Sequence, residues 1–205
     1  MPGKREEYLL WEEFFMGSAM LVSLRSKDPS NQVGACIVND DRKVLSLGYN
    51  GLTKNMDDDT FDWKSTGEQT GIIENIKDNF VVHAERNAIL NFRGNTNELI
   101  GSTLYVTWYP CIECTKEIIQ AGITKVVYLR MYSKPDQVKI SSMMFEKAGV
   151  EVVPYTQKEI TKEEEINSKL EIQKVIKRIR KKNWEKEGEL LWWVLKNMQT
   201  ILIIQ

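Results

Sequence analysis

Three of the four histidine and cysteine residues in this chain fall into one pattern, and no other feature restricts its fold as strongly. His83 opens the sequence His83-Ala84-Glu85, and Pro110-Cys111-Ile112-Glu113-Cys114 follows, with Cys111 28 residues after His83. One imidazole and two thiolates suit a tetrahedral zinc ion and leave its fourth position for water. A fold that uses all three ligands must bring these two segments together.

The same pattern predicts a chemistry. His-x-Glu followed by Pro-Cys-x-x-Cys is the signature of zinc-dependent nucleobase deaminases. Hydrolytic deamination needs a hydroxide at the ring carbon and a proton for the departing ammonia. Zinc lowers the pKa of water to roughly 7. Glu85 is expected to carry the proton from the water to the ring nitrogen and then to the leaving amine, without being a ligand.

Two other interpretations of the cysteines are weaker. A closed structural zinc site normally has four protein ligands, and the one spare cysteine or histidine is Cys36. Cys36 lies in an apolar segment of strand character, where a buried free thiol is the expected state. A redox Cys-x-x-Cys would not need the His-x-Glu. We therefore expect a catalytic zinc ion bound by His83, Cys111 and Cys114.

Composition narrows the class of protein. At 205 residues the chain is long enough for one good-sized domain with an appendage. Its 28 basic and 29 acidic residues give a net charge of -1, which offers no general reason to bind nucleic acid or an anionic membrane. The longest apolar stretch, Leu190–Ile204, is interrupted by polar residues and is too short to span a bilayer. With few cysteines and no apolar signal-peptide core, the protein is expected to be soluble and cytoplasmic.

Hydrophobic periodicity predicts an α/β fold. A helix is expected first, then a hairpin, a long polar and acidic loop at 53–78 with some helix at 68–77, and alternating helices and strands. The expected helices are 8–26, 82–92, 111–121 and 136–148, and the expected strands are 33–38, 44–49, 103–109, 126–129 and 150–153. This order predicts a five-stranded mixed sheet covered by helices on both faces.

The chain changes character at about Thr156. Residues 8–155 are expected to form the zinc domain, and 156–205 a charged, helical C-terminal extension of unknown role. A solvated helix with a thin apolar stripe is the simplest interpretation, and a partner-binding helix or oligomer arm is the alternative. The run Leu190–Leu195, which includes Trp192 and Trp193, is too apolar to lie comfortably in water.

The residues around the zinc pattern resemble the deoxycytidylate deaminase family from about Tyr8 to Tyr155. The resemblance is carried by Arg25-Ser26-Lys27-Asp28-Pro29, Gln32–Asn39, Gly48-Tyr49-Asn50-Gly51, His83–Ile89, Tyr109–Cys114, Ile118–Ile123 and Ala148-Gly149-Val150. It implies a three-layer α/β/α sandwich of the cytidine deaminase type. It also implies hydrolysis of dCMP to dUMP and ammonia for thymidylate synthesis, assembly as a homo-hexamer, and regulation by dCTP as activator and dTTP as inhibitor.

The resemblance also implies roles for residues beyond the zinc pattern. It implies substrate-binding roles for Arg25, Ser26, Asn50, Ala84 and Tyr132, and effector-binding roles for Gly48, Tyr49 and Gly51. Asn50 matches an asparagine that contacts the sugar, although Asn-Gly is also a common turn pair. Tyr132 falls where the family approaches the substrate phosphate, although it could simply pack at a strand end.

Two rival functions remain at this point. A deaminase acting on tRNA adenosine or single-stranded DNA uses the same zinc chemistry, but it usually needs an electropositive track that this chain's balanced charge does not suggest. A catalytically inactive scaffold that oligomerises through its C-terminal helix is the non-enzymatic alternative. The presence of Glu85 argues against the scaffold, because a scaffold has no use for a proton shuttle.

Overall fold

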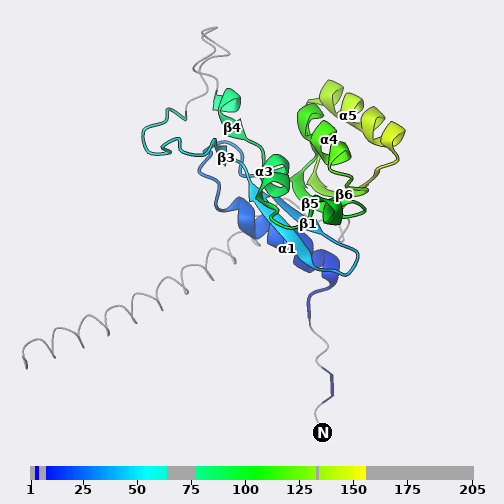
Figure 1. Ribbon diagram of the computed structural model, residues 1–205. Helices are drawn as coiled ribbons and strands as arrows, with labels where there is room; N and C mark the ends of the chain where they lie inside the picture. Colours follow the sequence, from blue (N-terminus) through cyan, green and yellow to red (C-terminus); the bar gives the residue numbers. More distant parts are fainter. Residues whose placement is uncertain (1–2, 5–7, 64–76, 133, 156–205) are drawn as a thin grey trace, which may run out of the picture. The chain divides into compact units, whose positions relative to one another are not determined.

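Five strands form one mixed sheet between two layers of helices (Figure 1). The computed structural model describes residues 3–4, 8–63, 77–132 and 134–155. The strand order is β2-β1-β5-β6-β7, with β1 at Gly34–Val38, β2 at Val44–Tyr49, β5 at Thr103–Trp108, β6 at Lys125–Arg130 and β7 at Glu151–Pro154. A separate pair of two-residue strands joins β3 (Gly51–Leu52) to β4 (Val81–Val82).

Strand direction gathers the candidate site at one edge of the sheet. β5, β6 and β7 are parallel, so the ends of β5 and β6 lie side by side, with Trp108 paired to Arg130. β1 runs antiparallel to both β2 and β5, so its first residue, Gly34, lies beside Tyr49 at the end of β2. The loops at this edge therefore come from before β1 and from after β2, β5 and β6.

One face of the sheet is covered by α1 (Trp11–Ser23). Phe15, Met16 and Ala19 on this helix pack against buried side chains of the strands, which are Cys36, Val38, Tyr105 and Val127. The Glu13 carboxylate accepts a hydrogen bond from the Leu10 N–H at 2.6 Å, which satisfies a free amide before the first turn. Gly34 lets the helix approach closely, because a Cβ there would lie 1.9 Å from the Ala19 carbonyl oxygen.

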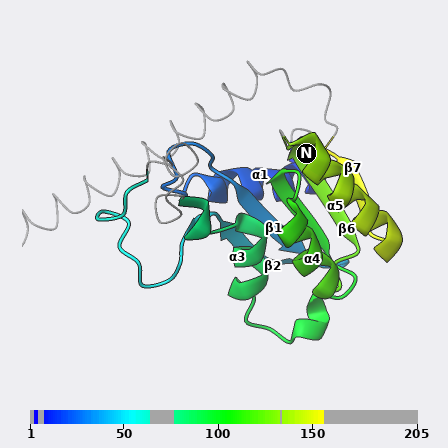
Figure 2. The same ribbon diagram turned by 90° about the horizontal axis from the view of Figure 1, so that it is seen from above.

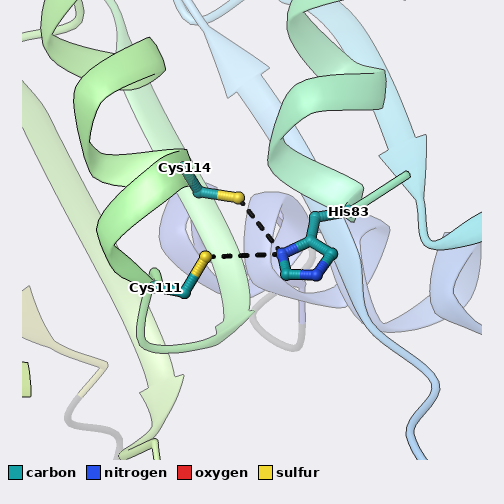
Figure 3. Close-up of side chains that lie close together, drawn as sticks. All are labelled: His83, Cys111 and Cys114. Carbon is teal, nitrogen blue, oxygen red and sulfur yellow. Dashed lines mark hydrogen bonds between the residues drawn. The ribbon is translucent and has the colours of Figure 1, made fainter. Parts of the chain in front are cut away.

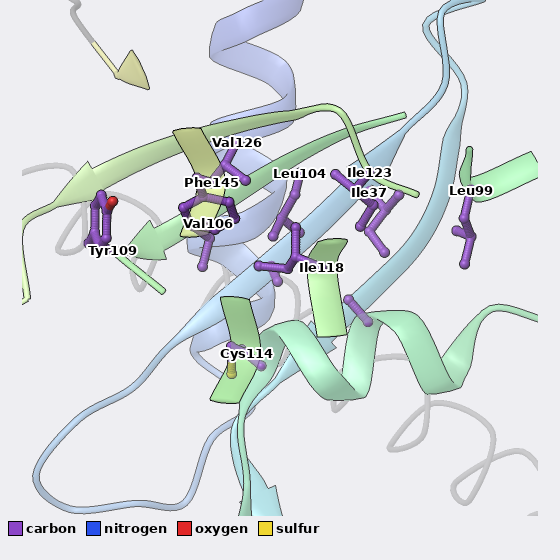
Figure 4. Packing of buried hydrophobic residues seen from close by; sticks show 13 residues of the cluster. Ile37, Leu99, Leu104, Val106, Tyr109, Cys114, Ile118, Ile123, Val126 and Phe145 are labelled. Atoms are coloured by element: carbon purple, nitrogen blue, oxygen red, sulfur yellow. The ribbon is translucent and has the colours of Figure 1, made fainter. Parts of the chain in front are cut away.

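The opposite face is covered by α3 (Ala84–Asn91), α4 (Ile112–Gln120) and α5 (Pro135–Ala148), as Figure 2 shows. Their buried side chains meet those of the strands in the larger core, which Figure 4 shows from close by. Among its fully buried members are Ile37, Leu104, Val106, Ile118, Val126 and Phe145. This core holds the starts of α3 and α4 against the sheet. The predicted metal ligands lie at these two helix starts.

The predicted architecture is confirmed. All five strands occur in the expected places, and the four expected helices cover both faces of the sheet. The small β3–β4 pair and two short 3-10 helices, η2 (Lys77–Asn79) and η3 (Thr96–Leu99), were not predicted. Residues 64–76 of the acidic loop and the whole extension 156–205 lie outside the described residues, so the predictions for them stay predictions. None of the described helices is long and apolar enough to cross a membrane.

Candidate metal centre and substrate cleft

The three predicted zinc ligands meet at the starts of two helices. β4 leads directly into His83, which is the residue before α3, and β5 leads through Tyr109 and Pro110 into Cys111, the residue before α4. Cys114 lies in the first turn of α4. Figure 3 shows both sulfurs pointing toward the same ring nitrogen of His83. The free amides and positive dipole ends at helix starts favour negative thiolates there.

The distances between the donor atoms fit a zinc ion. His83 Nδ1 lies 3.5 Å from Cys111 Sγ and 3.4 Å from Cys114 Sγ. All three atoms lie within 4.8 Å of one another. Tetrahedral zinc, with bonds of about 2.3 Å to sulfur and about 2.0 Å to nitrogen, places such atoms roughly 3.5 Å apart. The donor set therefore has the composition and spacing of a three-ligand zinc site with one open position.

The charges at the centre are strongly coupled. A hydrogen bond with Cys114 is the main cause that lowers the pKa of Cys111 to about 3, and His83 acts in the same direction. The hydrogen bond with Cys111, followed by burial, raises the pKa of Cys114. The hydrogen bond with Cys111 raises the pKa of His83 to about 9. A bound dication would favour both sulfurs as thiolates beside a neutral imidazole.

Glu85 is placed for proton transfer beside the metal ligands. It lies in the first turn of α3 and is only 4% exposed. Burial raises the pKa of its carboxyl, and the charge of His83 opposes that rise. A buried carboxyl with a raised pKa holds and releases protons closer to neutral pH than an exposed one.

Glu85 opens onto a cleft of about 330 Å³. Of the residues with a predicted role, those that line it are Asn50, His83, Ala84, Glu85, Cys111 and Tyr132. These residues come from the loops after β2, β5 and β6 and from the start of α3, which is the edge of the sheet described above. The cleft therefore brings together two of the metal ligands, the proposed proton carrier and three predicted substrate residues.

Asn50 has structural contacts in addition to its place in the cleft. Its Oδ1 accepts a hydrogen bond from the Val33 N–H at 2.8 Å, and its Nδ2 donates to the Asn31 carbonyl oxygen at 2.8 Å. One N–H and one lone pair of the amide remain for a ligand. The predicted sugar contact and the structural interpretation are thus compatible in this geometry.

The other predicted substrate and effector residues are not among those that line the cleft. Arg25 is exposed, with its guanidinium 6.0 Å from the centre of the Tyr49 ring, and Ser26 Oγ accepts a hydrogen bond from the Asp28 N–H. Gly48 lies under α3, because a Cβ there would be 2.2 Å from the Ala84 carbonyl oxygen. Close packing therefore explains this glycine by itself, and the effector roles of Gly48, Tyr49 and Gly51 stay predictions.

Several residues that line the cleft had no predicted role. They include Asp28, Asn31, Asp78, Trp108, Lys134 and Gln137. Asp28 and Asn31 flank the Pro29 turn, where such residues are ordinary turn formers. Lys134 is an exposed lysine before α5. Only the folded arrangement shows that these positions face the metal centre.

Comparison with known proteins agrees with this geometry. Residues 9–130 match the model of the cytidine and deoxycytidylate deaminase zinc-binding region. The chain is 41% identical over 170 residues to a human deoxycytidylate deaminase, covering 81% of this chain and 93% of that protein. It is 44% identical over 151 residues to a probable deoxycytidylate deaminase of Drosophila melanogaster, covering 72% and 73% of the two chains.

A solved structure shares the fold. The dCMP deaminase of the cyanophage S-TIM5, in complex with dCMP and dUMP, superposes with a TM-score of 0.55 at 29% identity, covering 70% of this chain and 95% of that one. The family match spans more than half of the 205 residues and includes all three candidate ligands. The site geometry and these relatives together show that the chain belongs to the zinc-binding cytidine and deoxycytidylate deaminase family.

Proposed function

We propose that this protein hydrolyses dCMP to dUMP and ammonia and so supplies dUMP for thymidylate synthesis. The observation that carries the proposal is the cluster of His83, Cys111 and Cys114, because two of these ligands line one cleft together with buried Glu85. The choice of dCMP rests on the likeness to deoxycytidylate deaminases and to a phage enzyme solved with dCMP and dUMP.

The chain's own residues then have distinct tasks. Zinc, when bound, lowers the pKa of water and so makes hydroxide available at neutral pH. Glu85 takes the proton from the water, delivers it to the ring nitrogen, and later protonates the departing amine. The first turn of α3 places Ala84 and Glu85, both buried, in the lining of the cleft. Asn50, Tyr132, Arg25 and Ser26 are proposed to contact the sugar and phosphate of the nucleotide.

Comparing dCMP with deoxycytidine tests the substrate proposal. Losing a charge-assisted contact to phosphate costs roughly 1.5–3 kcal/mol, which is about 10- to 150-fold. We therefore expect kcat/KM for dCMP to exceed that for deoxycytidine by at least about 10-fold. Equal values would indicate a nucleoside deaminase, and deamination of a tRNA anticodon stem in preference to dCMP would indicate a polymer substrate.

Regulation and assembly are further parts of the proposal. We infer activation by dCTP, inhibition by dTTP and assembly as a homo-hexamer from the family resemblance, which for the effectors includes Gly48–Gly51. We infer a cytoplasmic location because a reducing compartment preserves thiol ligands. Ammonia release from dCMP with each effector, together with native mass spectrometry, tests the first three. A constant rate with both effectors would remove the regulatory part.

The division of the chain is also a proposal. We propose that residues 8–155 hold the complete catalytic site and that catalysis does not need the extension 156–205. The histidine and all three cysteines of the chain precede residue 156, and so do those of the described residues that line the cleft. A chain ending near Lys158 should keep zinc and dCMP turnover. A truncated protein that is folded and hexameric but inactive would show that the extension reaches the active site.

A further inference from the structure

One buried ion pair at the cleft has no part in the chemistry described above. Lys77 Nζ lies 2.6 Å from Asp28 Oδ1, and the two side chains are only 7% and 4% exposed. The two residues are 49 positions apart in sequence. Buried charges normally persist only when they are paired and hydrogen-bonded, so this pair is a demanding feature of the fold.

Asp28 organises one wall of the cleft. Its Oδ1 also accepts hydrogen bonds from the N–H groups of Ser30 at 2.8 Å and Asn31 at 3.2 Å. This fixes the turn whose Asn31 carbonyl oxygen accepts the amide of Asn50. The same Asn50 side chain accepts the Val33 N–H. Asp28, Asn31, Val33 and Asn50 all line the cleft, so one connected network builds this wall.

Lys77 begins a second segment that reaches the cleft. It begins η2, and its carbonyl oxygen accepts the Phe80 N–H at 2.9 Å. The next residue, Asp78, lines the cleft, as does Val81 in β4. β4 then leads directly into His83. Lys77 therefore lies at the start of the segment that carries two cleft-lining residues and a metal ligand.

We propose that Lys77 and Asp28 are positioning residues that join two cleft-lining segments, residues 28–33 and 77–83, and so hold the cleft in shape for the nucleotide. The inference rests on the proposed function, because it assigns a substrate-binding role to a pair that touches neither the metal ligands nor Glu85. The ammonium of Lys77 also balances an acidic side chain in a cleft meant for an anionic substrate. Loss of the pair should loosen the wall at residues 28–33 and weaken nucleotide binding while leaving the proton-transfer groups in place.

Lys77→Met tests this in the full-length, zinc-loaded protein. We expect KM for dCMP to rise by about 10-fold or more, since small misplacements of binding groups have effects of this order. We expect kcat to stay within about threefold, because the interaction lost is made equally before and during the chemical step. Lys77→Arg, which keeps the charge, should raise KM less. The matched control is Lys125→Met. It breaks the exposed ion pair between Lys125 Nζ and Glu151 Oε1, which are 3.1 Å apart, and neither residue lines the cleft.

Amide hydrogen exchange measures local opening of residues 28–33 in the absence of substrate. Lys77→Met should speed exchange at the Ser30, Asn31 and Val33 amides, and Lys125→Met should not. If Lys77→Met does not fold or hold zinc, Lys77→Met combined with Asp28→Asn carries the same test. This double variant leaves no buried charge unpaired, and the amide oxygen still accepts both backbone hydrogen bonds. The raised KM is expected there too.

The outcomes separate this inference from the proposed function. A KM within about twofold of the unaltered chain in either folded, zinc-loaded variant overturns the positioning role, whatever happens to thermal stability. If the unaltered chain does not deaminate dCMP, the proposed function fails. Faster exchange in Lys77→Met would then still support the pair's control of the wall, and unchanged exchange would reject it.

Discussion

The metal centre lies beside the wall of the cleft that Asp28, Asn31, Val33 and Asn50 form, here called the outer wall. The two regions depend on the sequence in different ways. The metal centre comes from two short motifs, and each ligand lies at or within one turn of a helix start. The outer wall is held by hydrogen bonds between residues 17, 19 and 49 positions apart. The chemistry is therefore encoded locally, whereas the surface expected to recognise the substrate depends on the whole fold.

Removing a zinc ligand should abolish most metal binding at the locally encoded centre. Cys114→Ala and Cys111→Ala should each lose most of the zinc, about one per chain in the unaltered protein. Losing an outer-shell partner already costs roughly 10- to 100-fold in metal affinity, and losing a ligand should cost more. Metal analysis of the purified proteins measures this. Cys36→Ala is the control and should keep its zinc, and full occupancy in both ligand variants would show that the assignment is wrong.

Glu85→Gln separates the metal from the proton carrier within the same motif. The amide keeps the shape of the side chain but cannot carry the proton, so turnover should fall by about 10²-fold or more. Zinc content and thermal stability should stay close to those of the unaltered chain, because Glu85 is not among the three candidate ligands. Steady-state kinetics with dCMP measures the loss. Near-normal turnover would mean that another group moves the proton.

The sequence predicted the local half well for a physical reason. Metal ligands need particular side chains at particular spacings, so His83, Cys111, Cys114 and Glu85 stand out without knowledge of the fold. The five strands were likewise visible because burial imposes a regular pattern of apolar residues. The ligand residues were expected inside their helices, whereas His83 and Cys111 are the residues just before them.

The sequence could not predict the outer wall for the opposite reason. Asp28 and Lys77 are common residue types in polar segments, and nothing local distinguishes a buried pair from two solvated charges. The short β3–β4 pair that brings η2 near the cleft is also too brief to have a recognisable period. Gly48 shows the reverse case, since a residue assigned to an effector has a sufficient explanation in the packing of α3.

Asn50→Ala should have a smaller effect and should leave the metal centre intact. It removes hydrogen bonds to Val33 and Asn31, both 2.8 Å long, and leaves those backbone groups to find other partners. Stability should fall by about 1–3 kcal/mol, the cost of leaving a buried partner unsatisfied. KM for dCMP should rise while zinc content is unchanged. Urea denaturation and kinetics measure both, and an unaltered KM would leave Asn50 with a purely structural role.

The smallest effect is expected from Cys36, the cysteine outside both regions. Burial raises the pKa of its thiol from 9.0 to about 12. A raised folded-state pKa gives stability that is fully present below the unfolded pKa and is lost as the pH rises from about 9 toward about 12, because the unfolded thiol ionises first. Cys36→Ala lacks this ionisation, so its deficit of about 1 kcal/mol at pH 7 should narrow above pH 9. Melting temperatures of both proteins from pH 7 to 11 measure the difference. Tyr155, whose pKa burial also raises to about 12, is present in both and cancels. Because dCMP turnover at pH 7 should be the same in both proteins, a loss of activity in Cys36→Ala would show that the thiol takes part in the site after all.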